Sequence, residues 1–325
     1  MTAALLDIRD VHIGIIRRHG SDEIVRGVSI SVAPGEKLGI VGESGSGKTL
    51  TMLSVLRLLA SPPLGVVKGE ILLDGEDLAR VDAKRLRAVR GGEIAMVYQD
   101  PMSSLNPLMH VGKQIEETLK AHGSSPLVAS DRTREVLGQV GLADPERVRT
   151  SFPHQLSGGM IQRVMIAMAL ATSPRVLIAD EPTTALDVTI QRQILELVTS
   201  LQAETGMAVL WVTHDLGVVA SLVDNVVVMY AGRVVEKATT TQLFARPTHP
   251  YTKALLQSLP GTGSSHRSAL HQIGGTPPDP TRLGPGCPFR VRCPYAEEKC
   301  AQAEPELIDR GEGSFAACWK DPSQW

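Results

Sequence analysis

The stretch "GESGSGKT", residues 42–49, has the residue types and spacing of a phosphate-binding loop. It fits the pattern G-x-x-x-x-G-K-[ST], in which glycines let successive backbone N–H groups turn towards one anion. We expect Lys48 to reach the β- and γ-phosphates of a nucleotide and Thr49 to ligate Mg²⁺. The residues predicted to bind nucleotide here are Gly42, Glu43, Ser44, Gly45, Ser46, Gly47, Lys48, Thr49 and Leu50.

A second candidate site follows the apolar run in "RVLIADEP", residues 175–182. This run predicts a buried strand that ends in two carboxylates. Asp180 fits the acid that associates with Mg²⁺, and Glu181 could polarise an attacking water as a general base. Such a strand end is common in proteins, and it is the phosphate loop earlier in the chain that favours a catalytic role.

The stretch "LSGGMIQR", residues 156–163, predicts another anion cradle, without a lysine. Ser157, Gly158 and Gly159 open a predicted helix, whose first N–H groups can point at a phosphate. A simple kinase has no use for this second cradle. Three further polar residues follow or precede predicted elements: Gln99 in "VYQDP", Asp187 in "TTALD" and His214 in "VTHD".

All of the cysteines lie near the C-terminus, with the spacing C-x5-C-x6-C-x17-C: Cys287, Cys293, Cys300 and Cys318. A reducing compartment would argue against disulfides and favour metal binding. No pair shows the short C-x2–4-C knuckle of structural zinc, whereas iron–sulfur clusters accept varied spacings. We expect a structural [4Fe–4S] cluster, with Arg290, Arg292 and Lys299 offsetting its charge. Zinc and metal-free cysteines are the alternatives.

The elements that must position these residues alternate along the chain. Residues 5–45 predict short strands and hairpins, residues 48–59 a helix, and residues 103–155 a helical segment. Strands and helices then alternate, which predicts an α/β fold with a parallel sheet covered by helices. Residues 260–286 are rich in Gly, Pro, Ser and Thr and predict an irregular arm.

The composition excludes some classes of protein. The 325 residues carry a formal net charge of −2, which gives no reason to propose a nucleic-acid partner or direct attraction to anionic lipid. The apolar runs are far shorter than the roughly 18 residues of a membrane span, and the N-terminus lacks the apolar core of a signal peptide. We expect a cytoplasmic chain that reaches a membrane only through partners.

The order of these motifs resembles the ATP-binding cassette (ABC) ATPases over residues 5–240. The resemblance implies a parallel-sheet core with the phosphate loop, an antiparallel β subdomain and a helical subdomain at about 102–160. It implies catalytic roles for Glu181, His214 and Gln99, and Mg²⁺ ligation by Thr49, Gln99 and Asp180. Ser157, Gly158 and Gly159 would clamp ATP held by the loop of a different subunit, with Asp187 at the seam between subunits.

One feature departs from that family, whose members usually stack adenine on an aromatic residue before the phosphate loop. Residues 1–97 contain no Phe, Trp or Tyr. His12, His19, Ile15 or Ile16 could replace it.

The segment after residue 245 resembles the C-terminal extension of dipeptide/oligopeptide importer ATPases, through "RPTHPYTKALLQSLP" and "GCPFRVRCPYAEEKC". We therefore divide the chain into a cassette, 1–245, and an extension with the cysteine site, 246–325. Met160 after Ser-Gly-Gly fits the D-type member of that family's paired ATPases.

This second resemblance implies a heterodimer with a homologous ATPase, two integral-membrane permease subunits and an extracytoplasmic peptide-binding protein. The chain would lie peripherally on the cytoplasmic face of the inner membrane. Two alternatives stay open: a related importer for nickel or another small solute, and a soluble ABC ATPase with a redox or nucleic-acid role. The segment 50–155 is too short for the coiled coil of chromosome-maintenance ATPases.

Overall fold

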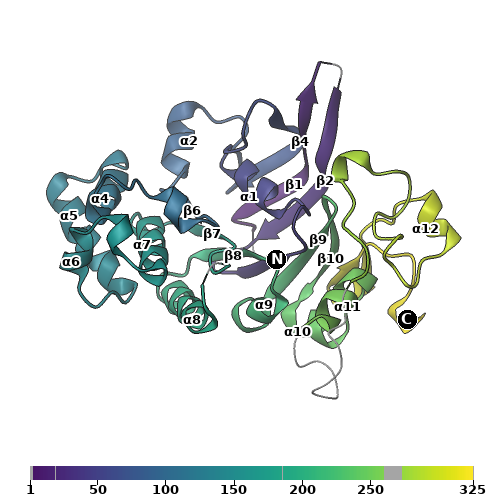
Figure 1. The fold of residues 1–325 in the computed structure, drawn as a ribbon. Coiled ribbons are helices and arrows are strands. Elements are labelled where there is room, and N and C mark those ends of the chain that lie inside the picture. The colour runs from purple at the N-terminus through teal and green to yellow at the C-terminus, as the bar shows by residue number, and fades with distance from the viewer. Residues whose placement is uncertain (1–2, 19, 185, 260–272, 325) are drawn as a thin grey trace. The chain divides into compact units, whose positions relative to one another are not determined.

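The computed structural model describes residues 3–18, 20–184, 186–259 and 273–324 of the chain (Figure 1). The chain forms two compact units. The first comprises Met1–Ala33, Lys37–Ala79 and Trp211–Trp325, and the second comprises Pro34–Glu36 and Arg80–Leu210. The strand β8 (Ala208–Thr213) begins in the second unit and ends in the first. All six of its residues are buried, which explains why its sequence shows no polar alternation.

The first unit contains an antiparallel sheet in the order β2-β1-β4-β5. Its strands are β1 (Leu6–Arg17), β2 (Gly20–Val32), β4 (Leu64–Leu73) and β5 (Glu76–Asp77). Of the short strands predicted at 5–45, those before residue 33 are in fact two long ones, β1 and β2. The pairing continues past the polar residues because the register shifts after Ile8, and Asp10 takes up a positive φ of 45° there. Such bulges absorb an extra residue without ending a strand.

The first unit also contributes the strand order β11-β12-β10-β9-β3 to a second sheet. Strand β3 (Lys37–Val41) runs parallel to β9 (Asn225–Tyr230), and β10 (Arg233–Thr239) is antiparallel to β9. The C-terminal extension then adds β12 (Ser314–Ala316) and β11 (Ile308–Gly311). The sequence predicted an irregular extension, but β12 pairs with the backbone groups that the edge of β10 would otherwise present, and β11 pairs with β12.

The helices of the first unit are short. They are α1 (Lys48–Val55), α9 (Leu216–Leu222), α10 (Thr240–Ala245), α11 (Pro250–Gln257) and α12 (Glu298–Gln302), with single 3₁₀ turns at Pro280–Arg282 and Pro322–Gln324. Helices α9 and α10 contact the second sheet, and α1 contacts the antiparallel one.

The second unit has a parallel pair of strands and most of the helical residues. Strand β6 (Ile94–Val97) pairs with β7 (Val176–Asp180). Its helices are α2 (Ala83–Val89), α3 (Pro101–Ser104), α4 (Val111–Ala121), α5 (Pro126–Gln139), α6 (Pro145–Arg149), α7 (Gly158–Leu170) and α8 (Val188–Thr205), with a 3₁₀ turn at Pro153–Gln155. The helical segment predicted at 103–155 is confirmed as α3–α6, in which Ser125 and Asp144 cap helices that begin with proline.

No helix within the described ranges is long and apolar enough to cross a membrane.

A buried polar cluster joins α11 to β10 in the first unit. Glu236 of β10 is 0% exposed and accepts hydrogen bonds from the Thr248 N–H at 2.6 Å, the Thr248 hydroxyl at 2.8 Å and the His249 N–H at 2.9 Å. The Nδ1 of His249 accepts from the Tyr251 N–H at 3.0 Å. Burial lowers the pKa of His249 to about 3, so this imidazole is neutral in the folded protein.

Acid should therefore destabilise the chain through His249. An unfolded histidine titrates near pH 6.5, so between about pH 6.5 and 3 only the unfolded chain takes up this proton. The stabilisation is complete above pH 6.5 and is lost as the pH falls. At pH 5 the loss should be about 2 kcal/mol.

The measurement is thermal unfolding of the wild type and His249→Gln at pH 7.5 and pH 5. Glutamine can accept the Tyr251 N–H but does not titrate, so the variant should lose less stability on acidification. An identical pH dependence in both proteins would contradict the assignment.

Candidate functional site

The predicted phosphate loop connects β3 to α1 within the first unit. Gly45 and Gly47 have φ values of +79° and +95°, which side chains other than glycine rarely adopt. At Gly42, a Cβ atom would overlap the carbonyl oxygen of Met229. These glycines are therefore required by the backbone path, which turns tightly at the end of a buried strand.

Lys48 lies inside this loop, only 5% exposed. Its Nζ donates to the carbonyl oxygen of Gly42 at 2.7 Å and of Glu43 at 3.0 Å, and lies 3.4 Å from the Ser46 hydroxyl. The neighbouring Thr49 is exposed. An ammonium group fixed inside this loop, at the N-terminus of α1, can bind a phosphate chain.

The two carboxylates that end β7 differ in their surroundings. Asp180 is 2% exposed, whereas Glu181 is half-buried and has a positive φ of 46°. The Glu181 Oε2 accepts from the Thr184 hydroxyl at 2.9 Å and from the Gln99 Nε2 at 3.3 Å. The structure thus brings Gln99 and Glu181 together. A strained backbone at a carboxylate oriented by two donors is typical of functional sites.

The second anion cradle lies at the start of α7. Ser157 occupies the N-cap position, but its hydroxyl makes no capping hydrogen bond, and Ser157 and Gly158 are exposed. A Cβ on Gly159 would lie 3.0 Å from the Ile190 Cγ2, tighter than an ordinary contact. The cradle therefore presents backbone N–H groups and a hydroxyl to solvent.

Asp187 has a structural role that we did not predict from the sequence. It is the N-cap of α8, and its Oδ1 accepts from the Ile190 N–H at 2.9 Å. The signal was present in the sequence, because Asp directly before a helical run is a typical N-cap.

The predicted nucleotide residues are distributed over both units. The phosphate loop and the exposed His214, directly after β8, belong to the first unit. The second unit contains Gln99, Asp180, Glu181, Ser157, Gly158, Gly159 and Asp187. The residues predicted to hold Mg²⁺ offer hydroxyl, carboxylate and carboxamide oxygens, the donor types that this cation prefers.

Three of the four candidates for adenine contact, His12, Ile15 and Ile16, belong to β1. His12 lies in β1, where its Nδ1 is 2.8 Å from the Glu23 Oε2 and its Nε2 is 3.2 Å from the Asp10 Oδ1. Ile16 is 53% exposed and Ile15 is partly buried. His19 lies outside the described residues.

The four cysteines gather in the extension without forming a disulfide. Each thiol is close enough to the other three to interact electrostatically, and burial raises the pKa of Cys287 to about 11. Zinc–sulfur bonds of about 2.3 Å would require sulfurs within about 4.6 Å of one another. In the described parts of the chain, no group of three or more His, Cys, Asp or Glu side chains is placed to hold a metal ion. The donor set suits iron or zinc, but the single-ion geometry is not formed.

The extension also contributes residues at the phosphate loop that sequence reasoning missed. Arg292 forms an ion pair with Glu43, and the Tyr251 hydroxyl accepts from the Glu43 N–H at 2.8 Å. We expected Arg292 only to offset the charge of a cluster. No signal along the chain links residues so far apart.

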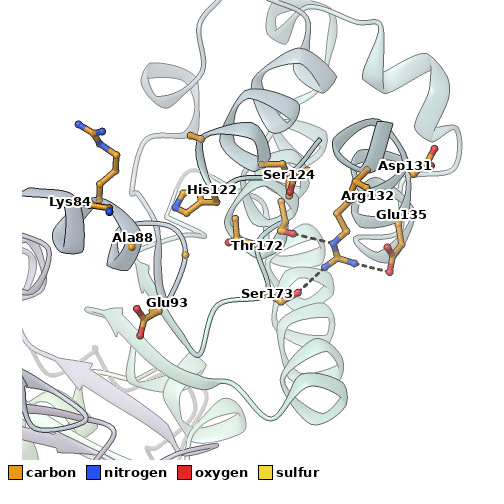
Figure 2. Close-up of a pocket in the computed structure, with 16 residues that line it drawn as sticks. Lys84, Ala88, Glu93, His122, Ser124, Asp131, Arg132, Glu135, Thr172 and Ser173 are labelled. Carbon is orange, nitrogen blue, oxygen red and sulfur yellow. Dashed lines mark hydrogen bonds and ion pairs between the residues drawn. The ribbon is translucent and has the colours of Figure 1, made fainter. Parts of the chain in front are cut away.

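A pocket of about 920 Å³ lies in the second unit, bordered by α2, α4 and α5 (Figure 2). Its 16 lining residues include none of the predicted nucleotide residues. Arg132 crosses one wall, where it donates to the Ala171 carbonyl at 3.1 Å and pairs with Glu135 at 2.7 Å.

Two family descriptions match the chain. "ABC transporter" matches residues 25–184, and "Oligopeptide/dipeptide transporter, C-terminal region" matches residues 235–300. A probable peptide ABC transporter ATP-binding protein of Sinorhizobium fredii is 49% identical over 97% of this chain and 95% of its own length. The oligopeptide transport ATP-binding protein OppD of Bacillus subtilis is 47% identical over 97% of this chain and 88% of its own.

Solved structures give the same result for the fold. A dimeric structure of the ATP-binding cassette MJ0796, in a post-hydrolysis state bound to ADP and Pi, has a TM-score of 0.64 and 28% identity. It covers 72% of this chain and 98% of the cassette. The predicted α/β cassette fold is thereby confirmed. The chain belongs to the ABC transporter family, in the group of peptide-transport ATP-binding proteins with the oligopeptide/dipeptide C-terminal region.

Proposed function

We propose that this chain hydrolyses ATP to power the import of di- or oligopeptides through an ABC transporter. One observation carries the proposal: the same chain contains a phosphate loop built around Lys48 and a segment that matches the oligopeptide/dipeptide transporter C-terminal region. Relatives nearly half identical over 97% of the chain are named for peptide transport. Nickel or another small solute is the alternative cargo, and a soluble ATPase is the alternative class.

Binding of ATP would rest on the loop and hydrolysis on the end of β7. The loop N–H groups and Lys48 would bind the phosphates. Glu181 would take a proton from the attacking water, which Gln99 orients, and His214 would contact the γ-phosphate. Thr49, Gln99 and Asp180 would hold Mg²⁺, which neutralises charge on the phosphates.

The second cradle supports a dimer. Ser157 and Gly158 are exposed, and with Gly159 their hydroxyl and N–H groups could clamp ATP held by another subunit. We propose a homologous ATPase subunit as that partner, with Asp187 at the seam, where its capping bond also fixes the start of α8. ATP binding would close such a dimer and hydrolysis would open it.

The membrane partners would be two permease subunits, with a peptide-binding protein outside the membrane. The chain would then lie peripherally on the cytoplasmic face. Helices α3–α6 would receive short helices of the permeases, and the pocket beside α4 and α5 is a concave feature suited to that contact.

The cysteines would hold a [4Fe–4S] cluster that stabilises the fold of the extension, with zinc as the alternative. What supports the proposal is that the four thiols gather in the extension and that iron–sulfur clusters are held by four thiolates. Arg290, Lys299 and Trp319 lie along the same segment, with the Lys299 Nζ 3.9 Å from the Trp319 ring centroid.

Glu181→Gln should slow ATP hydrolysis by roughly 10²–10⁴, because the glutamine cannot accept the proton. Nucleotide binding should persist, whereas Lys48→Ala should weaken binding itself. The assay is ATP turnover and peptide uptake by the reconstituted transporter, with the partner's site disabled. Near-normal turnover in Glu181→Gln would contradict its assignment as the general base. ATP turnover that is stimulated by nickel but not by peptide would indicate nickel as the cargo.

Ser157→Arg should impair the ATP site built on the partner's phosphate loop, because a bulky cation fills the cradle. Nucleotide binding to this chain's own loop should be unchanged. Each ATP site can be measured separately in heterodimers in which the phosphate-loop lysine of the other site is replaced. Full activity of the isolated chain, independent of its concentration, would contradict the shared site.

Cys293→Ser should remove the iron and make the extension more sensitive to protease. Anaerobically purified wild type should be brown, with roughly four irons and as many acid-labile sulfides per chain. A colourless protein with one stoichiometric zinc would rule the cluster out.

A further inference from the structure

The C-terminal extension reaches the phosphate loop through a shielded ion pair. Arg292 donates from Nη1 to the Glu43 Oε2 at 2.6 Å and from Nη2 to Oε1 at 2.9 Å. This two-pronged geometry is the strongest arrangement of guanidinium and carboxylate. The Arg292 side chain is only 4% exposed and that of Glu43 24%. The second residue of the loop is therefore bound to a residue 249 positions later in the chain.

Arg292 is itself fixed on several sides. Its Nε donates to the Gly274 carbonyl at 2.9 Å, and its Nη1 lies 3.3 Å from the Tyr230 hydroxyl. The guanidinium carbon lies 5.8 Å from the ring centroid of Tyr230 and 6.0 Å from that of Phe289. Both rings are 2% exposed. Arg292 thus cannot follow Glu43 if the loop moves, and instead limits where Glu43 can go.

The backbone of Glu43 connects this anchor to the lysine. Its N–H donates to the hydroxyl of the fully buried Tyr251 at 2.8 Å. Its carbonyl oxygen accepts from the Lys48 Nζ at 3.0 Å. Glu43 therefore joins two parts of the extension to Lys48. Its side chain binds Arg292, and its backbone contacts Tyr251 of α11 and Lys48.

We propose that Arg292 is a positioning residue for nucleotide binding. It holds the loop in its binding conformation, and it neutralises a carboxylate that would otherwise repel a triphosphate. The inference rests on the proposed function, in which this loop binds ATP. Because affinity falls with the fraction of loops in the competent conformation, releasing Glu43 weakens binding. Arg292 does not touch the reacting atoms, so turnover at saturation does not depend on it.

The test is ATP turnover by the assembled transporter. Arg292→Gln should raise the KM for ATP roughly tenfold, the range for hydrogen bonds to charged groups, and leave kcat within about twofold. Arg292→Lys keeps the charge without the second hydrogen bond. Its KM for ATP should therefore lie between those of the wild type and Arg292→Gln. The matched control is Arg282→Gln, at an arginine that is 86% exposed in the same extension, and its KM should equal that of the wild type.

A second comparison separates positioning from general loss of structure. The double variant Glu43→Gln/Arg292→Gln leaves no unpaired carboxylate, so its KM should fall below that of Arg292→Gln alone. Damage to the fold would instead make the double variant as poor or poorer, and this result would overturn the proposal. The proposal would also be overturned if Arg292→Gln had the melting temperature of the wild type and also its KM for ATP.

If Arg292→Gln does not fold, Glu43→Gln replaces it in the test. This variant also breaks the ion pair, so its KM for ATP should rise, and an unchanged KM would overturn the proposal. Failure of the proposed function looks different, because the wild type would then bind no ATP.

Discussion

The close packing of Gly42 against β9 is the constraint on which the candidate nucleotide site depends. The loop passes so near the Met229 carbonyl that no side chain fits at this position. This approach turns the chain directly from β3 into the loop and places the Gly42 carbonyl 2.7 Å from the Lys48 ammonium group. A displaced loop would lose both the lysine's acceptors and the start of α1.

The surroundings of the loop are rigid for a related reason. Beneath it, Tyr230, Tyr251 and Phe289 form an aromatic cluster with ring centroids 4.6–5.4 Å apart. The rings come from β9 and from two parts of the extension, α11 and the segment around Phe289, so one packed group joins segments that the sequence separates. Glu236 and His249 extend it as buried polar residues, with the carboxylate of Glu236 satisfied by three donors from Thr248 and His249. Packing of this kind holds α11 and the segment around Phe289 against β9.

In the second unit, Asp187 and Glu181 are each held by a contact three residues along the chain, and Glu181 has a distant partner as well. Asp187 caps its own helix, and Glu181 contacts Thr184 three residues later as well as Gln99. The positive φ of Glu181 costs conformational energy, which the buried strand before it and the hydrogen-bonded turn after it must overcome. A carboxylate held in this way keeps one direction, as a group that orients a water molecule needs to do.

The sequence by itself determined the features that depend on neighbours along the chain. The phosphate loop, the carboxylates after β7, the cradle before α7 and the helical segment α3–α6 are all local patterns, because capping, turns and periodicity act over a few residues. Only the tertiary structure decided that the extension adds β11 and β12 to the sheet, and that Arg292 pairs with Glu43. Nothing near Arg292 in the sequence favours that partner over Glu297 or Glu298. Which carboxylate it meets depends on how β9, α11 and the extension pack together, and that is a property of the whole folded unit.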